Sequence, residues 1–132
     1  MVRERIADDI YVFTSRRYAQ VTSGAILTKE GVILIDTLFY PDESQAIKDF
    51  LEQRLGQRIR YVINTHYHAD HTMGTCLFPQ ATVVAHSRCR ELLDTVGRDG
   101  LEQTKSQSPE FENVRIVLPD LLLDEGHMNL HL

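Results

Sequence analysis

The chain of 132 residues has no tryptophan and only two cysteines, Cys76 and Cys89. The two stand thirteen positions apart and form no Cys-x-x-Cys pair, which excludes a disulfide framework and a cysteine-rich zinc site. Cysteine used this sparingly is typical of a reducing compartment. We interpret Cys76 as a small buried thiol rather than a nucleophile.

Long apolar runs are also missing. No stretch approaches the ~20 apolar residues of a membrane-spanning helix. The opening residues, MVRERIADDIYVF, mix charges with single apolar residues, unlike the unbroken apolar core of a secretion signal. We therefore expect a cytoplasmic protein with no membrane partner, although a secreted protein that has lost its signal would give the same pattern.

Basic residues are outnumbered by acidic ones. Fourteen Lys and Arg stand against nineteen Asp and Glu, for a net charge of −5, and no basic cluster is interleaved with aromatic residues. A nucleic-acid partner is therefore not expected. The hydrophobic content of 42% suffices for one continuous core, so we expect residues 1–132 to form a single domain.

Short β-branched and apolar runs bounded by turn residues predict the strands. They are Ile10 to Phe13, Ala25 to Thr28, Val32 to Ile35, Tyr61 to Ile63, and Thr82 to Ala85. Lys29-Glu30-Gly31 predicts a hairpin between the second and third of these runs. Val32 to Ile35 does not alternate with polar residues, which indicates a strand covered on both faces.

Two segments predict helices between these strands. One runs from Pro41 to Leu55 and is closed by Gly56. The other runs from Ser87, as N-cap, to Val96, with Gly97 just past its end. Residues 98–112 are polar and irregular, which we interpret as a helix followed by a loop. The alternation of strands and helices predicts a layered α+β fold.

The stretch NTHYHADHTMG, residues 64–74, holds three of the six histidines and an aspartate within six positions. In an extended segment side chains two apart point the same way, so His66, His68 and Asp70 face one point, and His71 joins them where the chain turns near Ala69. On a helix the four side chains would lie on different faces. We therefore expect a loop at the end of a strand.

Imidazole and carboxylate groups are ligands for Zn²⁺, Fe or Mn²⁺. Four such ligands in six residues exceed what one tetrahedral ion takes from a single loop, so two ions sharing the loop would explain the number. The alternative is a histidine cluster at the surface or at a helix cap that binds no metal.

The segment THYHADH resembles the H-x-H-x-D-H signature of the metallo-β-lactamase superfamily. The resemblance extends back to Val32-Ile33-Leu34-Ile35-Asp36-Thr37, which is similar to the strand-ending aspartate of that family. It implies the αβ/βα sandwich of metallo-hydrolases. Met73 and Thr75 depart from the commoner Gly and Asn, so no single branch of the family is assigned.

The resemblance also implies roles for the clustered residues. His66 and His68 would bind a first metal, and Asp70 and His71 a second, with Asp70 also orienting the catalytic water. Asp36 would be a supporting residue near the site, and Gly74 would lie in the tight turn after it.

The implied activity is that of a zinc-dependent hydrolase acting on a small-molecule substrate. A metal-activated hydroxide would attack an ester, thioester, lactone or lactam carbonyl. Two alternatives remain: an iron-dependent oxidoreductase similar to persulfide dioxygenases, and a fragment without catalytic activity. Metal identity would separate the first alternative from a hydrolase.

The family's remaining metal ligands come from later segments, including a Gly-His-Thr. Gly126-His127 is the nearest match, but the alternation of Met128, Leu130 and Leu132 with polar residues predicts a half-exposed strand there. We interpret His86, between a strand and a helix, as structural. We therefore expect the chain to be the N-terminal half of such a domain, with an exposed sheet face that binds the missing half or a second copy.

Overall fold

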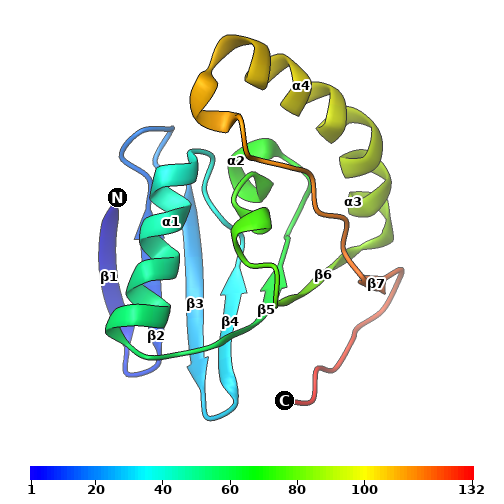
Figure 1. The fold of residues 1–132 in the computed structure, drawn as a ribbon. Helices are drawn as coiled ribbons and strands as arrows, with labels where there is room; N and C mark the ends of the chain where they lie inside the picture. Colours follow the sequence, from blue (N-terminus) through cyan, green and yellow to red (C-terminus); the bar gives the residue numbers. More distant parts are fainter.

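In the computed structural model, which describes residues 1–132, seven strands form one sheet in the order of the sequence (Figure 1). The strands are β1 (Val2–Ala7), β2 (Ile10–Thr14), β3 (Thr22–Thr28), β4 (Gly31–Ile35), β5 (Ile59–Ile63), β6 (Thr82–His86) and β7 (Leu121–Leu123). β1 to β4 pair in antiparallel fashion, and β4 to β7 pair in parallel. The predicted α+β class is confirmed.

The antiparallel half contains the expected hairpin and one strand that the sequence did not indicate. β3 and β4 pair from Thr28 and Gly31 outward, as the turn residues predicted. Gly31 has a φ of +129°, and a Cβ there would lie 2.6 Å from the carbonyl oxygen of Arg58, so a glycine is required. β1 was missed because three charged residues, Arg3, Glu4 and Arg5, interrupt its apolar ones, and all six residues are exposed without an alternating pattern. Charges on such an edge strand oppose pairing with another molecule.

The predicted first helix is confirmed. α1 (Pro41–Asp49) continues as a π-helical turn over Phe50–Arg54, and Gly56 follows with a φ of +62°. Its apolar stripe packs on the sheet, where the ring of Phe50 stands edge-on to Tyr11 and Phe13 at centroid distances of 5.0 and 6.1 Å. Phe13 and Phe50 belong to the main core, and Tyr11 packs against it.

The helix expected from Ser87 to Val96 and the one expected at the start of residues 98–112 are both present, but they form one continuous helix. α3 (Ser87–Leu92) passes through a π-helical turn at Leu93–Gly97 into α4 (Arg98–Gln107). The prediction that Gly97 ends the helix was wrong: Gly97 has helical angles, and Leu101 extends the apolar stripe into a cluster with Phe111. Ser87 is not the N-cap either, because the ring of His86 accepts the hydrogen bond from the backbone N–H of Arg88.

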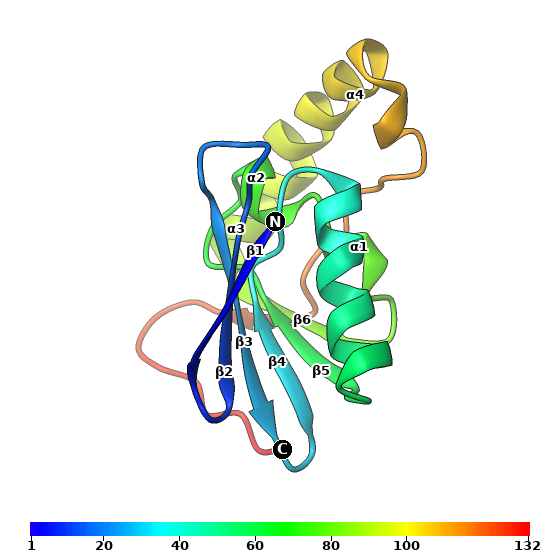
Figure 2. The same cartoon turned by 90° about the vertical axis from the view of Figure 1, so that its left-hand side faces the viewer.

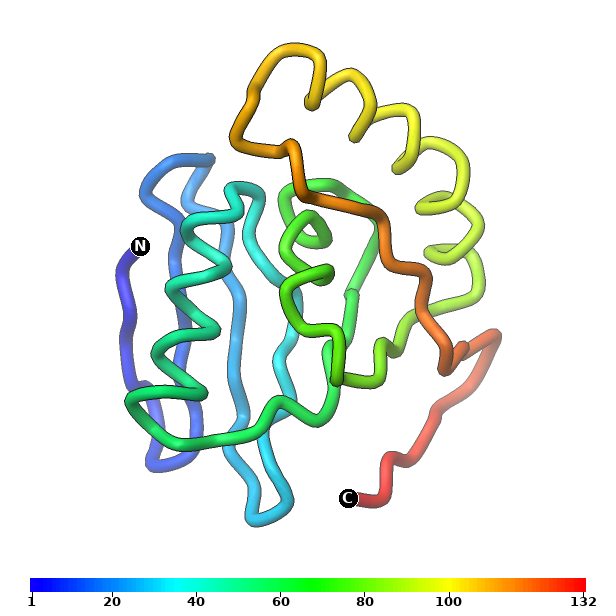
Figure 3. Tube along the Cα trace, viewed as in Figure 1, coloured from blue at the N-terminus to red at the C-terminus, as the bar shows by residue number.

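The chain returns from α4 to the far edge of the sheet (Figure 3), and Val114 packs on the way against Met73, which follows the short helix α2 (Ala69–Thr72). Only Leu121–Leu123 pairs there, with β6, so the predicted strand over residues 128–132 was wrong. Gly126, with a φ of +78°, lies where the chain turns away from the edge. Met128 and Leu130 instead line a hollow with Ile63 and Val84.

The two faces of the sheet differ in cover. Figure 2 shows α1 on one side and the C-terminal segment on the other. Phe13, Leu34 and Val62 are fully buried on the helix side. Ile10, Ile26 and Ile33, which are cross-strand neighbours, alternate with buried positions and are only half-buried. This second face is called the open face below. None of the helices is both long and apolar enough to cross a membrane.

A buried carboxylate in the first turn of α1 ties the helix to the loop after β2. Glu43 accepts hydrogen bonds from the hydroxyl of Ser15 and from the backbone N–H of Arg16, at 2.9 Å for the latter. Burial alone would raise the pKa of Glu43, but the hydrogen bonds from Ser15 and Arg16, together with the hydrogen bond and charge of the Met1 amine at 3.3 Å, outweigh burial and the pKa is lowered. The ionised form is therefore the one that the fold stabilises.

Replacing Glu43 with glutamine should lower the free energy of unfolding at neutral pH by about 1–3 kcal/mol, because charge-assisted hydrogen bonds are lost. A carboxyl whose pKa falls on folding contributes stability above its unfolded value of 4.5, and this is lost as the pH falls through the folded value. Urea denaturation at several pH values should therefore show the difference between wild type and variant shrinking in acid. Glu52→Gln, at an exposed position, is the control; an equal loss in both variants would contradict the assignment.

Candidate metal centre

The histidine cluster lies just beyond the carboxyl end of β5. His66 and His68 are in the loop that follows the strand, as predicted. Asp70 and His71 are not in a loop: they belong to α2 (Ala69–Thr72), a single helical turn. The helix supplies the change of direction near Ala69 that the spacing required.

The four predicted side chains do come together. The ring of His66 lies 4.8 Å from that of His68 and 4.3 Å from that of His71, between centroids. Nε2 of His71 is 3.9 Å from a carboxylate oxygen of Asp70.

Two groups of three residues have potential metal-binding atoms within 4.8 Å of one another. One consists of His66, His68 and Asp70, and the other of Asp36, His66 and His71. His66 belongs to both groups, so it is the centre of the cluster.

Asp36 enters the cluster from the end of β4. Its carboxylate is buried; Oδ2 accepts hydrogen bonds from the Thr65 hydroxyl at 2.6 Å and from Nδ1 of His71 at 2.9 Å, and Oδ1 accepts one from the Thr65 backbone N–H at 2.8 Å. The φ of Asp36 is +60°, a left-handed conformation that aspartate tolerates better than most residues. The sequence placed Asp36 near the site but gave no sign of these contacts.

A second connection joins α2 to the residue after Asp36. The backbone N–H and the hydroxyl of Thr37 both donate to the carbonyl oxygen of His71, at 2.9 and 3.0 Å. The N–H of Gly74 donates to the Thr37 hydroxyl at 3.0 Å. A Cβ on Gly74 would lie 2.2 Å from Oγ of Ser44 and 2.9 Å from Cβ of Thr37. There is therefore no room for a side chain at position 74, and a glycine is required.

The electrostatics of the cluster favour neutral imidazole at its centre. Burial lowers the pKa of His66, and the neighbouring His71 and His68 lower it further, against the opposing effect of Asp36 and Asp70. Neutral imidazole is the form that binds metal. The lowered pKa therefore keeps His66 in its neutral, ligating form to a lower pH than an isolated histidine.

The other histidines and the cysteines take no part in the cluster. His86 is structural, as expected: besides capping α3 it bonds through Nε2 to the carbonyl oxygen of Asp124 at 2.6 Å. His127 is exposed and belongs to neither metal-type group. Cys76 is a buried free thiol. Burial raises the pKa of Cys89 to about 11, so this thiol is not a nucleophile at neutral pH.

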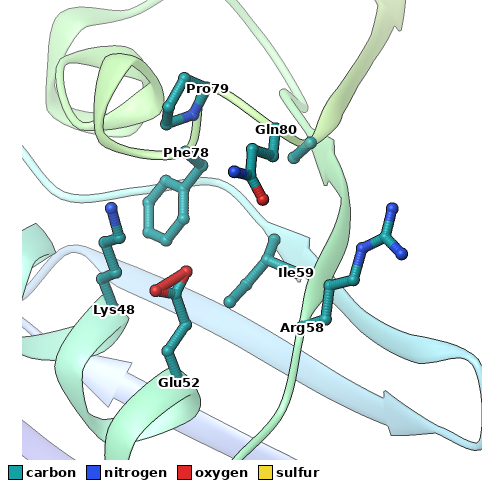
Figure 4. Close-up of a pocket in the computed structure, with 8 residues that line it drawn as sticks. Lys48, Glu52, Arg58, Ile59, Phe78, Pro79 and Gln80 are labelled. Atoms are coloured by element: carbon teal, nitrogen blue, oxygen red, sulfur yellow. The ribbon is translucent and has the colours of Figure 1, made fainter.

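A separate hollow of about 130 Å³ lies at the other end of β5, where that strand begins (Figure 4). It contains no histidine or cysteine and a single carboxylate, so it offers no metal site. Its lining residues are Lys48, Glu52, Arg58, Ile59, Phe78, Pro79, Gln80 and Ala81.

A comparison with known protein families agrees with a metal site at this cluster. The sequence model of the Metallo-beta-lactamase superfamily matches residues 16–131. Because the match covers most of the chain, the protein belongs to this superfamily.

Solved structures show the same fold. A metallo-beta-lactamase from Pontibacter korlensis has 18% identity and a TM-score of 0.71, with 98% of this chain and 55% of that chain covered. One from Erythrobacter litoralis, with beta mercaptoethanol in its active site, has 19% identity, a TM-score of 0.62 and coverages of 72% and 45%. FIM-1 from Pseudomonas aeruginosa, in a mono-zinc form, has 16% identity, a TM-score of 0.62 and coverages of 73% and 46%. The chain thus spans about half the length of these proteins.

Gly74→Ala should destabilise the protein by about 1–3 kcal/mol, because the added methyl group meets atoms of the packed core. Gly100→Ala is the matched control: nothing lies within 4 Å of a Cβ at that position in α4. There the same change should raise stability by about 0.5–1 kcal/mol, since alanine favours a helix. Thermal and urea denaturation of both variants measure the contrast; a neutral Gly74→Ala would show that α2 is not held as described.

Proposed function

We propose that this chain carries the metal site of a metal-dependent hydrolase that attacks the carbonyl of a small ester, thioester, lactone or lactam. The observation that supports the proposal most strongly is the convergence of His66, His68, Asp70 and His71 beyond the carboxyl end of β5. Membership of the superfamily supports the same chemistry.

The donor set suits zinc, with iron or manganese as the other metals that nitrogen and carboxylate ligands accept. His66, His68 and Asp70 form the more available group, because the carboxylate of Asp36 in the other group is occupied by hydrogen bonds. His71 uses Nδ1 for Asp36 and keeps Nε2 free. It would hold a second ion together with Asp70.

Zinc bound in this site would supply a Lewis acid that polarises a carbonyl and makes water a stronger acid. The residues of this chain would position the metal and the attacking water. Asp70 is a partly exposed carboxylate, able to accept a hydrogen bond from the attacking water and thereby orient it. Asp36 is buried and holds His71, so it takes no direct part in the reaction.

Asp70→Ala should strongly lower the zinc affinity of the 132-residue chain. Loss of a residue that only supports a ligand typically costs about 10–100-fold in affinity, and loss of a ligand itself should cost more. The circular dichroism of the variant should not change, because Asp70 contributes no core packing. Asp99→Ala, an exposed change in α4, is the control. Calorimetric titration with zinc measures both affinities, and equal affinities would remove Asp70 from the site.

The same proteins can be tested for turnover on a panel of ester, thioester and lactam substrates. A catalytic zinc usually has three protein ligands. With two ions bound, the four residues give three ligands to the first ion and two to the second only when Asp70 serves both, so at least one ion is short of a ligand. Zinc occupancy in the chain alone should therefore be partial, with little turnover. A longer protein that contains this chain should hydrolyse at least one substrate and lose that activity with Asp70→Ala. Full activity with tightly bound zinc in the short chain would mean that another residue, such as His127, completes the site.

The open face supports a proposal about assembly: it is covered in the working protein by a second copy of the chain or by the other half of the domain. Half-buried isoleucines on neighbouring strands make it apolar. Sedimentation of the chain alone should therefore show dimers or larger species. A stable monomer of 15.2 kDa that binds no hydrophobic dye would contradict this.

A further inference from the structure

Thr65 lies between Asp36 and His66 and contacts both. Its Oγ1 is 2.6 Å from Oδ2 of Asp36 and 2.9 Å from Nδ1 of His66. Its backbone N–H donates to Oδ1 of the same carboxylate at 2.8 Å. Two bonds to Asp36 therefore fix the hydroxyl in front of the His66 ring.

The direction of these bonds follows from the protons available. A hydroxyl has one proton to donate, and an ionised carboxylate only accepts. The short contact with Asp36 therefore takes the Thr65 proton, which leaves the hydroxyl oxygen as an acceptor. Nδ1 of His66 must then carry a proton and donate it to Thr65. In a neutral imidazole the lone pair is then on Nε2.

We propose that Thr65 is a positioning residue. Its hydroxyl donates to the carboxylate of Asp36 and accepts from Nδ1 of His66, a relay that leaves Nε2 as the ligand atom of His66. Oδ2 of Asp36 also accepts the hydrogen bond from Nδ1 of His71. One carboxylate oxygen thus selects the tautomer of two histidines, directly for His71 and through Thr65 for His66. The tautomers belong to the chain without metal; only their use in metal binding rests on the proposed function.

His68 provides an internal comparison. Its ring is exposed and stands edge-on to Tyr67 and His66, and no protein group bonds to its ring nitrogens. Its neutral form is free to exchange between tautomers. The relay therefore predicts a difference between His66 and His68 although only one residue separates them.

The experiment is nitrogen NMR of the histidine rings in the ¹⁵N-labelled, metal-free chain, at a pH where the imidazoles are neutral. In the wild type, His66 and His71 should carry the proton on Nδ1, and His68 should show a mixture. In Thr65→Val, which keeps the side-chain shape, His66 should move to a mixture while His71 stays unchanged. Thr65→Ser, which keeps the hydroxyl, should restore the wild-type signals of His66.

Valine at position 65 should be tolerated by packing, since Thr65 is exposed. Thr95→Val removes an exposed hydroxyl from the helical turn between α3 and α4 and serves as the control. A wild-type His66 protonated on Nε2, or one unaffected by Thr65→Val, would overturn the relay.

Zinc titration of the same variants separates the relay from the proposed function. With both correct, Thr65→Val should weaken zinc binding by about 10–100-fold and Thr65→Ser should not. If the tautomer of His66 changes while zinc affinity does not, the relay stands and the role of His66 as a ligand fails. If zinc affinity falls but the tautomer is unchanged, the relay is overturned and the metal site stands.

Discussion

The buried carboxylate of Asp36 is the group on which the rest of the site depends. Both of its oxygens are occupied, by Thr65 twice and by His71 once, so it connects the end of one strand with a loop and a helix that come later in the chain. A buried charge is tolerated only when hydrogen bonds replace its water. Thr65 and His71 therefore make the burial of Asp36 possible, and Asp36 in turn holds both residues in place.

The parallel pairing of β4 with β5 makes this contact possible. Ile35 pairs with Ile63, so the residues that follow the two strands leave the sheet at the same edge. The backbone N–H of Asp36 donates to the carbonyl oxygen of Ile63 at 2.8 Å, which extends the ladder by one bond before the chains separate. The left-handed conformation of Asp36 then turns its chain away from the strand. Functional groups at the carboxyl ends of parallel strands recur in layered α/β sheets for this geometric reason.

Local spacing was enough to predict that His66, His68 and Asp70 converge, because all three lie within five residues, although Asp70 reaches the cluster from the helix α2 and not from an extended segment as expected. It could not predict the contact of His71 with Asp36, thirty-five residues away, or the role of Thr65, since both depend on how two strands pair. The continuation of the helix past Gly97 was missed for a similar reason. Gly97 is a frequent helix terminator, but the packing of Leu101 against the cluster with Phe111 outweighs that local preference. The only available clue to Thr65 was its position next to the first histidine.

All potential metal ligands of the cluster come from one edge of the sheet, and this limits how a bound ion would be enclosed. β4 supplies Asp36, and the loop and helix after β5 supply the rest, so a bound ion would be held from one side with its remaining positions open. Open positions are what a catalytic metal needs for water and substrate, whereas a structural metal is enclosed by protein.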